Sequence, residues 1–288
     1  MRYHSATSFE EAARLSFQAS GVTRFLAGGT DVLVQLRSGA VMPDDLIDIK
    51  NISGVYDITN NPDGSWTIGA AVPGAQLGKH SKLSADWPGV VEGMEVVGST
   101  QIQGRATLVG NLCNGSPAAD SVPGLIAAGA SATITELNGS RDIAIENIPV
   151  GPGKTSLEKG EVISAIHIPN RGADAGDAYL RFIPRTEMDI AVVGCAVNLR
   201  LSENKISEAR VVLGAVAPTA ILVPDAADAI VGTSLDEDTI DKLMSVVRQV
   251  SKPIDDKRAS AEYRTELIGV LAKRAAQLAY SRAKGDSR

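Results

Sequence analysis

Two glycine-containing runs carry the residue types in this chain that could hold a diphosphate. The first, at residues 25–32, has a Gly-Gly pair after an apolar segment and before a threonine and an aspartate. The second, at residues 107–111, ends in Gly110 and Asn111. Glycine allows positive φ angles and has no Cβ to keep a ligand away, so exposed backbone N–H groups can bind a diphosphate without a lysine. One Gly-Gly pair is first of all a turn signal. Two such loops, each beginning with an apolar strand-like run, predict one dinucleotide held between them.

No other grouping of residues indicates catalysis or metal binding. The sequence has no Ser–His–Asp set, no zinc-type spacing and no pair of catalytic carboxylates, and its three histidines are scattered. Its two cysteines, Cys113 and Cys195, lie far apart, so the chain cannot bind a four-cysteine iron–sulfur cluster by itself. We expect both thiols to be small, buried apolar side chains. The sequence therefore predicts a chain that binds a cofactor, with no catalytic residue and no metal site of its own.

Composition restricts the class of protein and of partner. The chain has 288 residues, of which 44% are hydrophobic, and this fits a soluble globular protein of two domains. Its net charge of −6 argues against a nucleic-acid partner, which would require a basic face. No apolar run approaches the roughly 20 residues that span a bilayer, and no secretory signal is visible. We therefore expect a cytoplasmic protein without a membrane span.

The first glycine loop belongs to a small α/β unit at residues 1–53. Ser8 begins a capping-box pattern that predicts a helix, and a strand follows at 24–27. A second short helix after the glycines should end near Gly39, before a strand at 46–49. The loop is thus expected at the carboxyl end of a strand.

Residues 54–171 are expected to complete the first domain. A hairpin turns at residues 60–64, where Pro-Asp-Gly is a strong turn signal, and a strand at 162–168 closes the domain. The stretch 98–123 has no clear period and is rich in Gly, Asn, Ser and Pro. A long loop in a compact domain is usually functional, and this one contains the second glycine run.

A second domain, at residues 177–284, follows a small polar linker at 172–176. Strands at 190–201 and 206–216 predict an antiparallel hairpin, since polar turn residues separate them. Helices are predicted over 235–250 and 260–284. The fold class expected for the whole chain is α+β.

Five ordered runs of the chain resemble one known family, the FAD-binding medium subunits of molybdenum hydroxylases, which include xanthine dehydrogenase and aerobic carbon-monoxide dehydrogenase. The resemblance extends over about residues 1–283. One branch, the 4-hydroxybenzoyl-CoA reductases, carries an iron–sulfur cluster on this subunit and is disfavoured because the cysteines are missing. The runs are residues 25–32, 107–120, 185–191 (Arg-Thr-Glu-Met-Asp-Ile-Ala), 214–219 (Gly-Ala-Val-Ala-Pro-Thr) and 256–264 (Asp-Lys-Arg-Ala-Ser-Ala-Glu-Tyr-Arg).

The resemblance implies a two-part FAD-binding domain of the PCMH type at 1–171, with subdomains of about 1–53 and 54–171. A C-terminal α/β domain with an antiparallel sheet packed on helices would follow at 177–284. Relatives of this fold attach flavin through a histidine in the Gly-Gly loop. This chain has Thr30 and Asp31 there, so its FAD should be non-covalent.

The expected FAD contacts come from both loops, from the residues after the second loop, and from one closing strand. Asp31 would contact a ribityl hydroxyl or cap the following helix, and Asp120 would accept from a ribose or ribityl hydroxyl or cap the helix at 122–130. Arg181 stands where the family has a lysine, which keeps the charge but changes the hydrogen-bond geometry. The full set is Ala27, Gly28, Gly29, Thr30, Asp31, Val32, Thr107, Leu108, Val109, Gly110, Asn111, Ser116, Ala119, Asp120, Ile163 and Arg181.

The function that the resemblance implies is electron transfer inside a larger oxidoreductase. A large partner subunit would hold the molybdenum cofactor and the substrate, and a small partner would hold [2Fe–2S] clusters. This chain would pass electrons from those clusters through FAD to an external acceptor, in a complex expected to be a dimer of heterotrimers. Two alternatives stay open: a stand-alone FAD-dependent oxidoreductase, and a non-catalytic scaffold that has lost its cofactor.

Overall fold

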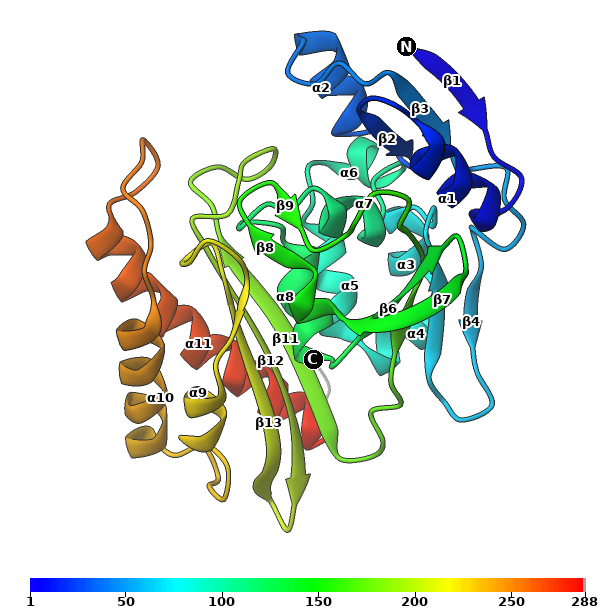
Figure 1. Ribbon diagram of the computed structural model, residues 1–288. Helices are drawn as coiled ribbons and strands as arrows, with labels where there is room; N and C mark the ends of the chain where they lie inside the picture. The colour runs from blue at the N-terminus through cyan, green and yellow to red at the C-terminus, as the bar shows by residue number, and fades with distance from the viewer. Residues whose placement is uncertain (287–288) are drawn as a thin grey trace.

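A three-stranded parallel sheet, with strand order β1-β3-β2, forms the N-terminal subdomain at the top right of Figure 1. The computed structural model describes residues 1–286. As predicted, the Ser8 side chain caps the first helix by accepting the Glu11 N–H at 3.1 Å, and Gly39 ends the second helix in a left-handed conformation. The elements are β1 (Arg2–Ser5), α1 (Phe9–Gln18), β2 (Thr23–Leu26), α2 (Val32–Ser38) and β3 (Asp45–Asp48).

An antiparallel five-stranded sheet, with order β4-β5-β10-β6-β7, is the centre of the second subdomain. The predicted hairpin and the closing strand are confirmed, and Trp66 and Trp87 are buried in the core, each only 1% exposed. The strands are β4 (Ile58–Asn60), β5 (Trp66–Gly69), β6 (Ser131–Glu136), β7 (Gly139–Ala144), β8 (Pro149–Gly151), β9 (Lys154–Thr155) and β10 (Val162–Ile168). The helices are α3 (Gly74–Lys79), α4 (Ser81–Asp86), α5 (Pro88–Glu95), α6 (Thr100–Gln103), α7 (Leu108–Cys113), α8 (Ser121–Ala127) and the 3₁₀ turn η1 (Ile145–Asn147).

The prediction of one long loop over residues 98–123 is wrong. This stretch contains α6 and α7, and α8 begins inside it. The strand-like start assigned to the second glycine run is also wrong, because residues 108 and 109 form the first turn of α7. Helices of four to six residues are too short to show an apolar period, so their sequence signal is restricted to caps such as Thr107.

The C-terminal domain has a four-stranded antiparallel sheet of order β11-β12-β13-β14. The predicted hairpin between β12 and β13 and the two long helices are confirmed. Sequence reasoning missed β11, which begins inside the expected linker. Its Gly176 lies against α11, where a Cβ would come within 2.1 Å of the Ala279 carbonyl oxygen, so the small residues there serve close packing. The elements are β11 (Ala175–Phe182), β12 (Val193–Ser202), β13 (Lys205–Gly214), β14 (Ile221–Leu222), α9 (Pro224–Asp228), α10 (Glu237–Val250) and α11 (Ala261–Ala283).

The two faces of this C-terminal sheet belong to two different cores. Tyr179, Ala196 and Val212 lie in register across β11, β12 and β13, and all three pack into the core of the first domain. Helices α5 and α8 contact that face, whereas α11 lies across the other (Figure 1). The sheet is therefore shared between the domains. The residues in register on its opposite face, which pack into the C-terminal core, are Ala178, Val197 and Val211.

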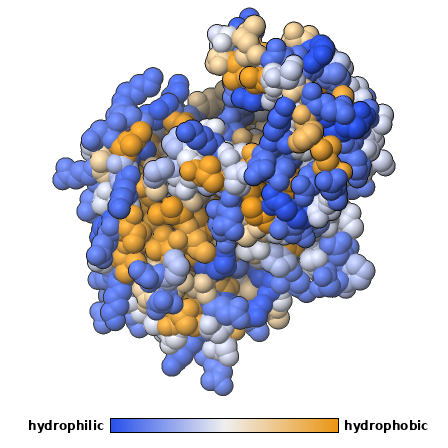
Figure 2. All heavy atoms as spheres, viewed as in Figure 1, coloured by the Kyte–Doolittle hydropathy of each residue, from blue (hydrophilic) through white to orange (hydrophobic). Residues whose placement is uncertain are grey.

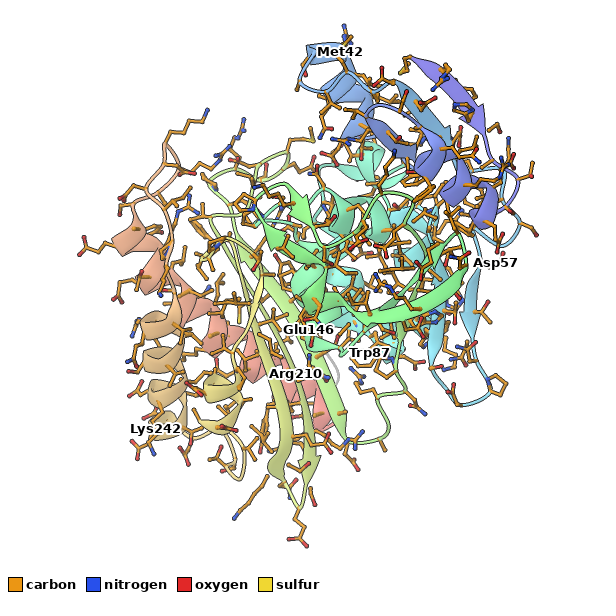
Figure 3. The ribbon with its side chains drawn as sticks, viewed as in Figure 1. Met42, Asp57, Trp87, Glu146, Arg210 and Lys242 are labelled. Carbon is orange, nitrogen blue, oxygen red and sulfur yellow. The ribbon has the colours of Figure 1, made fainter. Side chains whose placement is uncertain are left out.

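Ion pairs join the two domains at their boundary. Arg171 pairs with Asp177 at 2.5 Å, and the other Asp177 oxygen accepts the Gly89 N–H at 2.8 Å. Burial raises the pKa of the Asp177 carboxyl to about 6, although the Arg171 charge opposes that shift. Farther along, Glu146 of η1 and Arg210 of β13 meet at 3.0 Å (Figure 3). The domains are thus joined by specific ion pairs as well as by apolar packing.

Replacing Arg171 with glutamine should lower the free energy of unfolding by about 3 kcal/mol, because Asp177 would stay buried without its charge partner. The pKa of the Asp177 carboxyl is higher in the folded chain than in the unfolded chain. Its ionisation therefore destabilises the fold increasingly as the pH rises from the unfolded pKa to the folded pKa. The loss measured by urea denaturation should therefore be larger at pH 8 than at pH 5. Arg248→Gln, which breaks the more exposed pair with Glu266, is the control and should cost about 0.5 kcal/mol. Equal losses for the two variants would contradict this role for Arg171.

Candidate functional site

A cavity of about 650 Å³ lies between the N-terminal subdomain and the second subdomain. One wall consists of β2, the loop after it and α2, and the other of α7, the segment after β8, and the start of β10. Figure 2 shows the hollow in the surface below α2. Both glycine runs found in the sequence line this cavity.

The two glycines of the first loop are required for different physical reasons. Gly29 has a φ of 80°, a conformation that a residue with a Cβ rarely adopts. At Gly28 a Cβ would come within 1.9 Å of the Arg105 carbonyl oxygen. The absent side chain at Gly28 therefore lets this loop lie directly against the backbone that leads into α7. This contact places the two loops side by side.

The two loops present unpaired backbone donors to the cavity. Thr107 accepts the Gly110 N–H through its Oγ1 at 2.9 Å and so caps α7. The earlier N–H groups at the starts of α2 and α7 have no acceptor among residues 1–286, as expected for helix N-termini. Such groups can bind phosphate oxygens. The unpaired donors on residues that line the cavity are those of Thr30, Asp31, Val32 and Val109.

Asp31 does not cap the helix that follows it, so that alternative is wrong. Its side chain makes no hydrogen bond to the first turn of α2, although it occupies the capping position. Instead, Asn114 Nδ2 donates to Asp31 Oδ1 at 3.3 Å. Desolvation raises the pKa of the Asp31 carboxyl. The carboxyl oxygens are available to accept from a hydroxyl of a ligand in the cavity.

Most of the residues predicted to contact the cofactor line this one cavity. Leu108 is buried behind it, and Ser116, Ala119, Asp120 and Arg181 lie outside its lining. The residues that line it are Ala27, Gly28, Gly29, Thr30, Asp31, Val32, Thr107, Val109, Gly110, Asn111 and Ile163.

Asp120 is the centre of a buried polar cluster that joins the two domains. Its Oδ1 accepts the Tyr179 hydroxyl at 2.7 Å, and its Oδ2 accepts Arg181 Nη1 at 2.7 Å. It makes no side-chain bond to the first turn of α8, so the alternative of a helix cap is wrong here too. Burial raises the pKa of the Asp120 carboxyl to about 6, while the Arg181 charge and the Tyr179 bond lower it. Arg181 is thus the direct charge partner of the Asp120 carboxylate.

Sequence reasoning missed several cavity residues on the wall that follows β9. Glu158, Lys159 and Glu161 line it, and the only signal is a run of charged residues around Gly160. Cys113 also lines the cavity and is exposed, so the expectation that it is buried is wrong. Its position at the last turn of α7 turns it toward the cavity. Cys195 is fully buried, as expected.

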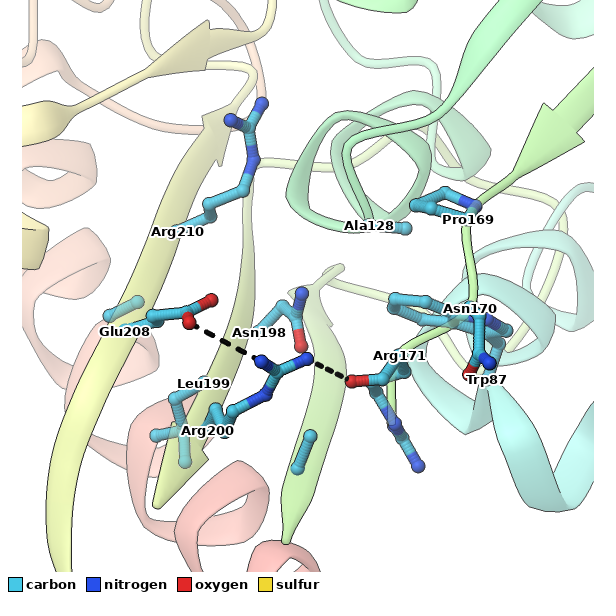
Figure 4. A pocket seen from close by; sticks show the side chains of 12 residues that line it. Trp87, Ala128, Pro169, Asn170, Arg171, Asn198, Leu199, Arg200, Glu208 and Arg210 are labelled. Carbon is cyan, nitrogen blue, oxygen red and sulfur yellow. Dashed lines mark hydrogen bonds and ion pairs between the residues drawn. The ribbon is translucent and has the colours of Figure 1, made fainter. Parts of the chain in front are cut away.

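A second, smaller cavity of about 260 Å³ lies at the seam between the domains, as shown in Figure 4. Its arginines already have partners in the protein: Arg200 pairs with Glu208 at 3.3 Å and donates to the Arg171 carbonyl oxygen at 2.5 Å. It contains neither glycine loop. The larger cavity is therefore the candidate site for a dinucleotide.

Comparison with known proteins agrees with this assignment. Residues 1–171 match the family model described as the FAD binding domain in molybdopterin dehydrogenase. The chain belongs to this FAD-binding family. Residues 178–279 match a second model, the CO dehydrogenase flavoprotein C-terminal domain. The chain is thus a FAD subunit of the xanthine and CO dehydrogenase type, which confirms the family predicted from the sequence.

Individual relatives are similar over nearly their whole length. The xanthine dehydrogenase FAD-binding subunit of Escherichia coli O157:H7 is 33% identical, with 98% of this chain and 97% of the relative covered. The carbon monoxide dehydrogenase medium chain of Afipia carboxidovorans is 31% identical, at 98% and 97% coverage. The solved structure of carbon monoxide dehydrogenase from Hydrogenophaga pseudoflava has a chain that superposes with a TM-score of 0.93, at 29% identity and 98% coverage of both chains. These likenesses confirm the predicted two-domain α+β fold.

Among residues 1–286 no helix has the length and apolar character needed to cross a bilayer. The same part of the chain holds no group of three or more His, Cys, Asp or Glu side chains arranged to bind a metal ion.

Replacing Arg181 with methionine should lower the free energy of unfolding by about 3 kcal/mol, because Asp120 would remain buried without a cation. Arg181→Lys, which introduces the residue of the resembling family, should cost about 1 kcal/mol, since an ammonium keeps the charge but loses the planar geometry of the guanidinium. Urea denaturation at pH 7.5 measures both changes. A methionine variant as stable as the lysine variant would contradict the proposed pairing.

Proposed function

We propose that this chain is the FAD-carrying electron-transfer subunit of a heteromeric molybdenum hydroxylase. It would take electrons from [2Fe–2S] clusters of a small partner subunit and deliver them to an external acceptor. The observation that carries the proposal is the single cavity lined by two facing glycine loops, one of them held against the other through Gly28. Bound there, FAD would supply the redox chemistry, and the protein would supply binding and orientation.

The residues present fit such a cofactor. The unpaired N–H groups of the two loops would bind its diphosphate, and the positive φ of Gly29 shapes the first loop for this role. Asp31 would accept from a hydroxyl of the cofactor. Thr30 and Asp31 cannot form the histidyl bond of covalent flavoproteins, so the FAD would be non-covalent.

Asp120 and Arg181 help to position the domains around the proposed site. Their cluster spans from the end of the second loop region to β11, so it fixes the C-terminal domain beside the cavity. We propose that Ser116, Ala119 and Asp120 contact the cofactor beyond the cavity lining. Asp120, with both oxygens already accepting, would use its remaining lone pairs for a ribose or ribityl hydroxyl.

The partners are proposed from the relatives' names. Two of these relatives are medium chains of carbon monoxide dehydrogenases, which implies a large and a small chain beside them. For this chain we propose a large subunit with the molybdenum cofactor and a small iron–sulfur subunit, assembled as a dimer of heterotrimers in the cytoplasm. The organic substrate or carbon monoxide would then bind to the large partner.

Gly29→Val and Gly110→Val should each weaken FAD binding about 5- to 150-fold while the protein stays folded. A branched side chain resists the positive φ of Gly29, and at Gly110 a Cβ comes within 3.0 Å of Thr107 Oγ1, the atom that caps α7. The expected loss corresponds to strain of about 1–3 kcal/mol. Flavin released into the supernatant by acid precipitation measures the content of each purified variant.

Gly39→Val is the matched control for Gly29→Val. Gly39 also has a positive φ, of 72°, but it lies outside the cavity with open space around it. It should retain its FAD. Full flavin content in Gly29→Val, or yellow colour that stays with the acid precipitate, would contradict the proposed non-covalent cradle.

The complex itself is tested by purifying the native protein from its source and measuring flavin, iron and molybdenum in the same fractions. The proposal expects all three to co-elute with two further polypeptides, because an electron carrier must receive its electrons from a neighbouring centre. A chain that elutes alone, without iron or molybdenum, and oxidises an organic substrate at full rate would favour a stand-alone flavoenzyme. A chain that elutes alone and colourless would favour a scaffold.

A further inference from the structure

One wall of the cavity is a strap, residues 152–161, that runs from the β8–β9 hairpin to the start of β10. It belongs to the second subdomain, and in Figure 1 its hairpin lies below α2. On its inner side the strap lines the cavity through Gly153, Thr155, Leu157, Glu158, Lys159 and Glu161. It therefore faces the N-terminal subdomain across the candidate FAD site.

Hydrogen bonds near the two ends of the strap join it to different subdomains. Near its start, the Gly153 N–H donates to the Gly115 carbonyl oxygen at 2.9 Å, within the second subdomain. Near its end, Lys159 Nζ donates to the Ala19 carbonyl oxygen at 2.5 Å. Ala19 follows α1 of the N-terminal subdomain, so this second bond crosses between the two walls of the cavity.

The Lys159 bond meets an electrostatic need of α1. The C-terminal end of a helix carries unpaired carbonyl groups and partial negative charge, which a cation stabilises. The last turn of α1 has no basic residue of its own. Lys159, 140 positions away in the sequence, supplies that cation. A positively charged side chain is therefore favoured at this position.

The neighbouring residues hold the strap in position to make this contact. Gly160 has a φ of 91°, and a Cβ there would come within 3.0 Å of Phe17 Cβ on α1. Glu161 stiffens the turn, since its Oε2 accepts the Glu158 N–H at 2.7 Å and its Oε1 accepts Arg141 Nη2 at 2.5 Å. The turn is therefore rigid in itself, and the bond to Ala19 is the part that can open.

We propose that Lys159 is a latch that closes the strap over the bound cofactor and sets how long FAD stays in the cavity. The inference rests on the proposed function, because it takes FAD as the occupant. Lys159 acts here as a positioning residue: it joins the two subdomains that form the cavity walls. When the bond breaks, the strap loses its hydrogen bond to the N-terminal subdomain, while Gly153 and Glu161 still hold it to the second subdomain.

Lys159→Met should release FAD about 2- to 10-fold faster than the wild-type chain, the range expected for one lost hydrogen bond of ordinary strength. Methionine keeps a long flexible stem and removes the charge. Lys159→Arg restores a cation and should return the rate to within about twofold of wild type. Lys154→Met, on the same strap but outside the cavity lining, is the matched control and should release FAD at the wild-type rate.

The rate is measured on the FAD-loaded full-length chain as the rise in flavin fluorescence after a large dilution into flavin-free buffer. Gly160→Ala, which pushes the strap away from Phe17, should also speed release and tests the same contact without touching the lysine. Association should be faster as well in Lys159→Met, because an open strap admits FAD more readily. A variant that had merely lost structure would bind more slowly.

The outcomes separate this inference from the proposed function. A wild-type chain that takes up no FAD would overturn the proposed function and the latch with it. A wild-type chain that binds FAD, with Lys159→Met and Lys154→Met both releasing it at the wild-type rate, would overturn the latch alone. Faster release in Lys159→Met that Lys159→Arg does not rescue would likewise exclude the charge-based contact.

Discussion

The approach of Gly28 to the Arg105 carbonyl group is the constraint on which the candidate site depends. It is a contact between backbones, with no room for even one methyl group. Because it joins the loop after β2 to the segment before α7, it brings the starts of two helices from different subdomains to one cavity. Each helix start leaves N–H groups without acceptors. The proposed diphosphate site would thus arise from packing, without a lysine or arginine on the two loops.

A different principle holds the C-terminal domain beside this site. Asp120 and Asp177 are almost completely buried, and each carboxylate pairs with an arginine near β11. Such pairs add little net stability, since desolvation offsets much of the attraction, but breaking one leaves an unpaired charge inside the protein. They therefore select one relative position of the two domains. Apolar packing alone would tolerate small shifts between them.

A structural feature could be predicted from the sequence when its signal lay within a few neighbouring residues. The Ser8 cap, the Gly39 helix end and the hairpin between β12 and β13 have signals within a few residues, and all were predicted. Short α7 was missed because six residues cannot show a helical period. Its glycine run was recognised as a possible diphosphate-binding segment, but the run was predicted to begin as a strand, whereas it begins a helix.

Contacts between residues that are far apart in the chain could not be predicted from the sequence. The partners of Asp120 lie 59 and 61 positions away, so neither helix-cap reasoning nor spacing could indicate an ion pair. The same holds for Lys159 and Ala19. The role of Gly28 was predicted as room for a ligand, whereas its missing Cβ makes room for Arg105. Family resemblance predicted a set of residues, and the fold shows which of them line one cavity.

The sharing of one sheet between two cores has a consequence for how the chain is made. Ribosomal synthesis proceeds from the N-terminus, so the first 171 residues emerge before β11, β12 and β13 exist. Until those strands arrive, the sides of α5 and α8 that contact them have no apolar cover. The flavin domain therefore completes its core only near the end of translation. A nascent chain in this state exposes apolar surface, which makes it prone to aggregation until the strands form.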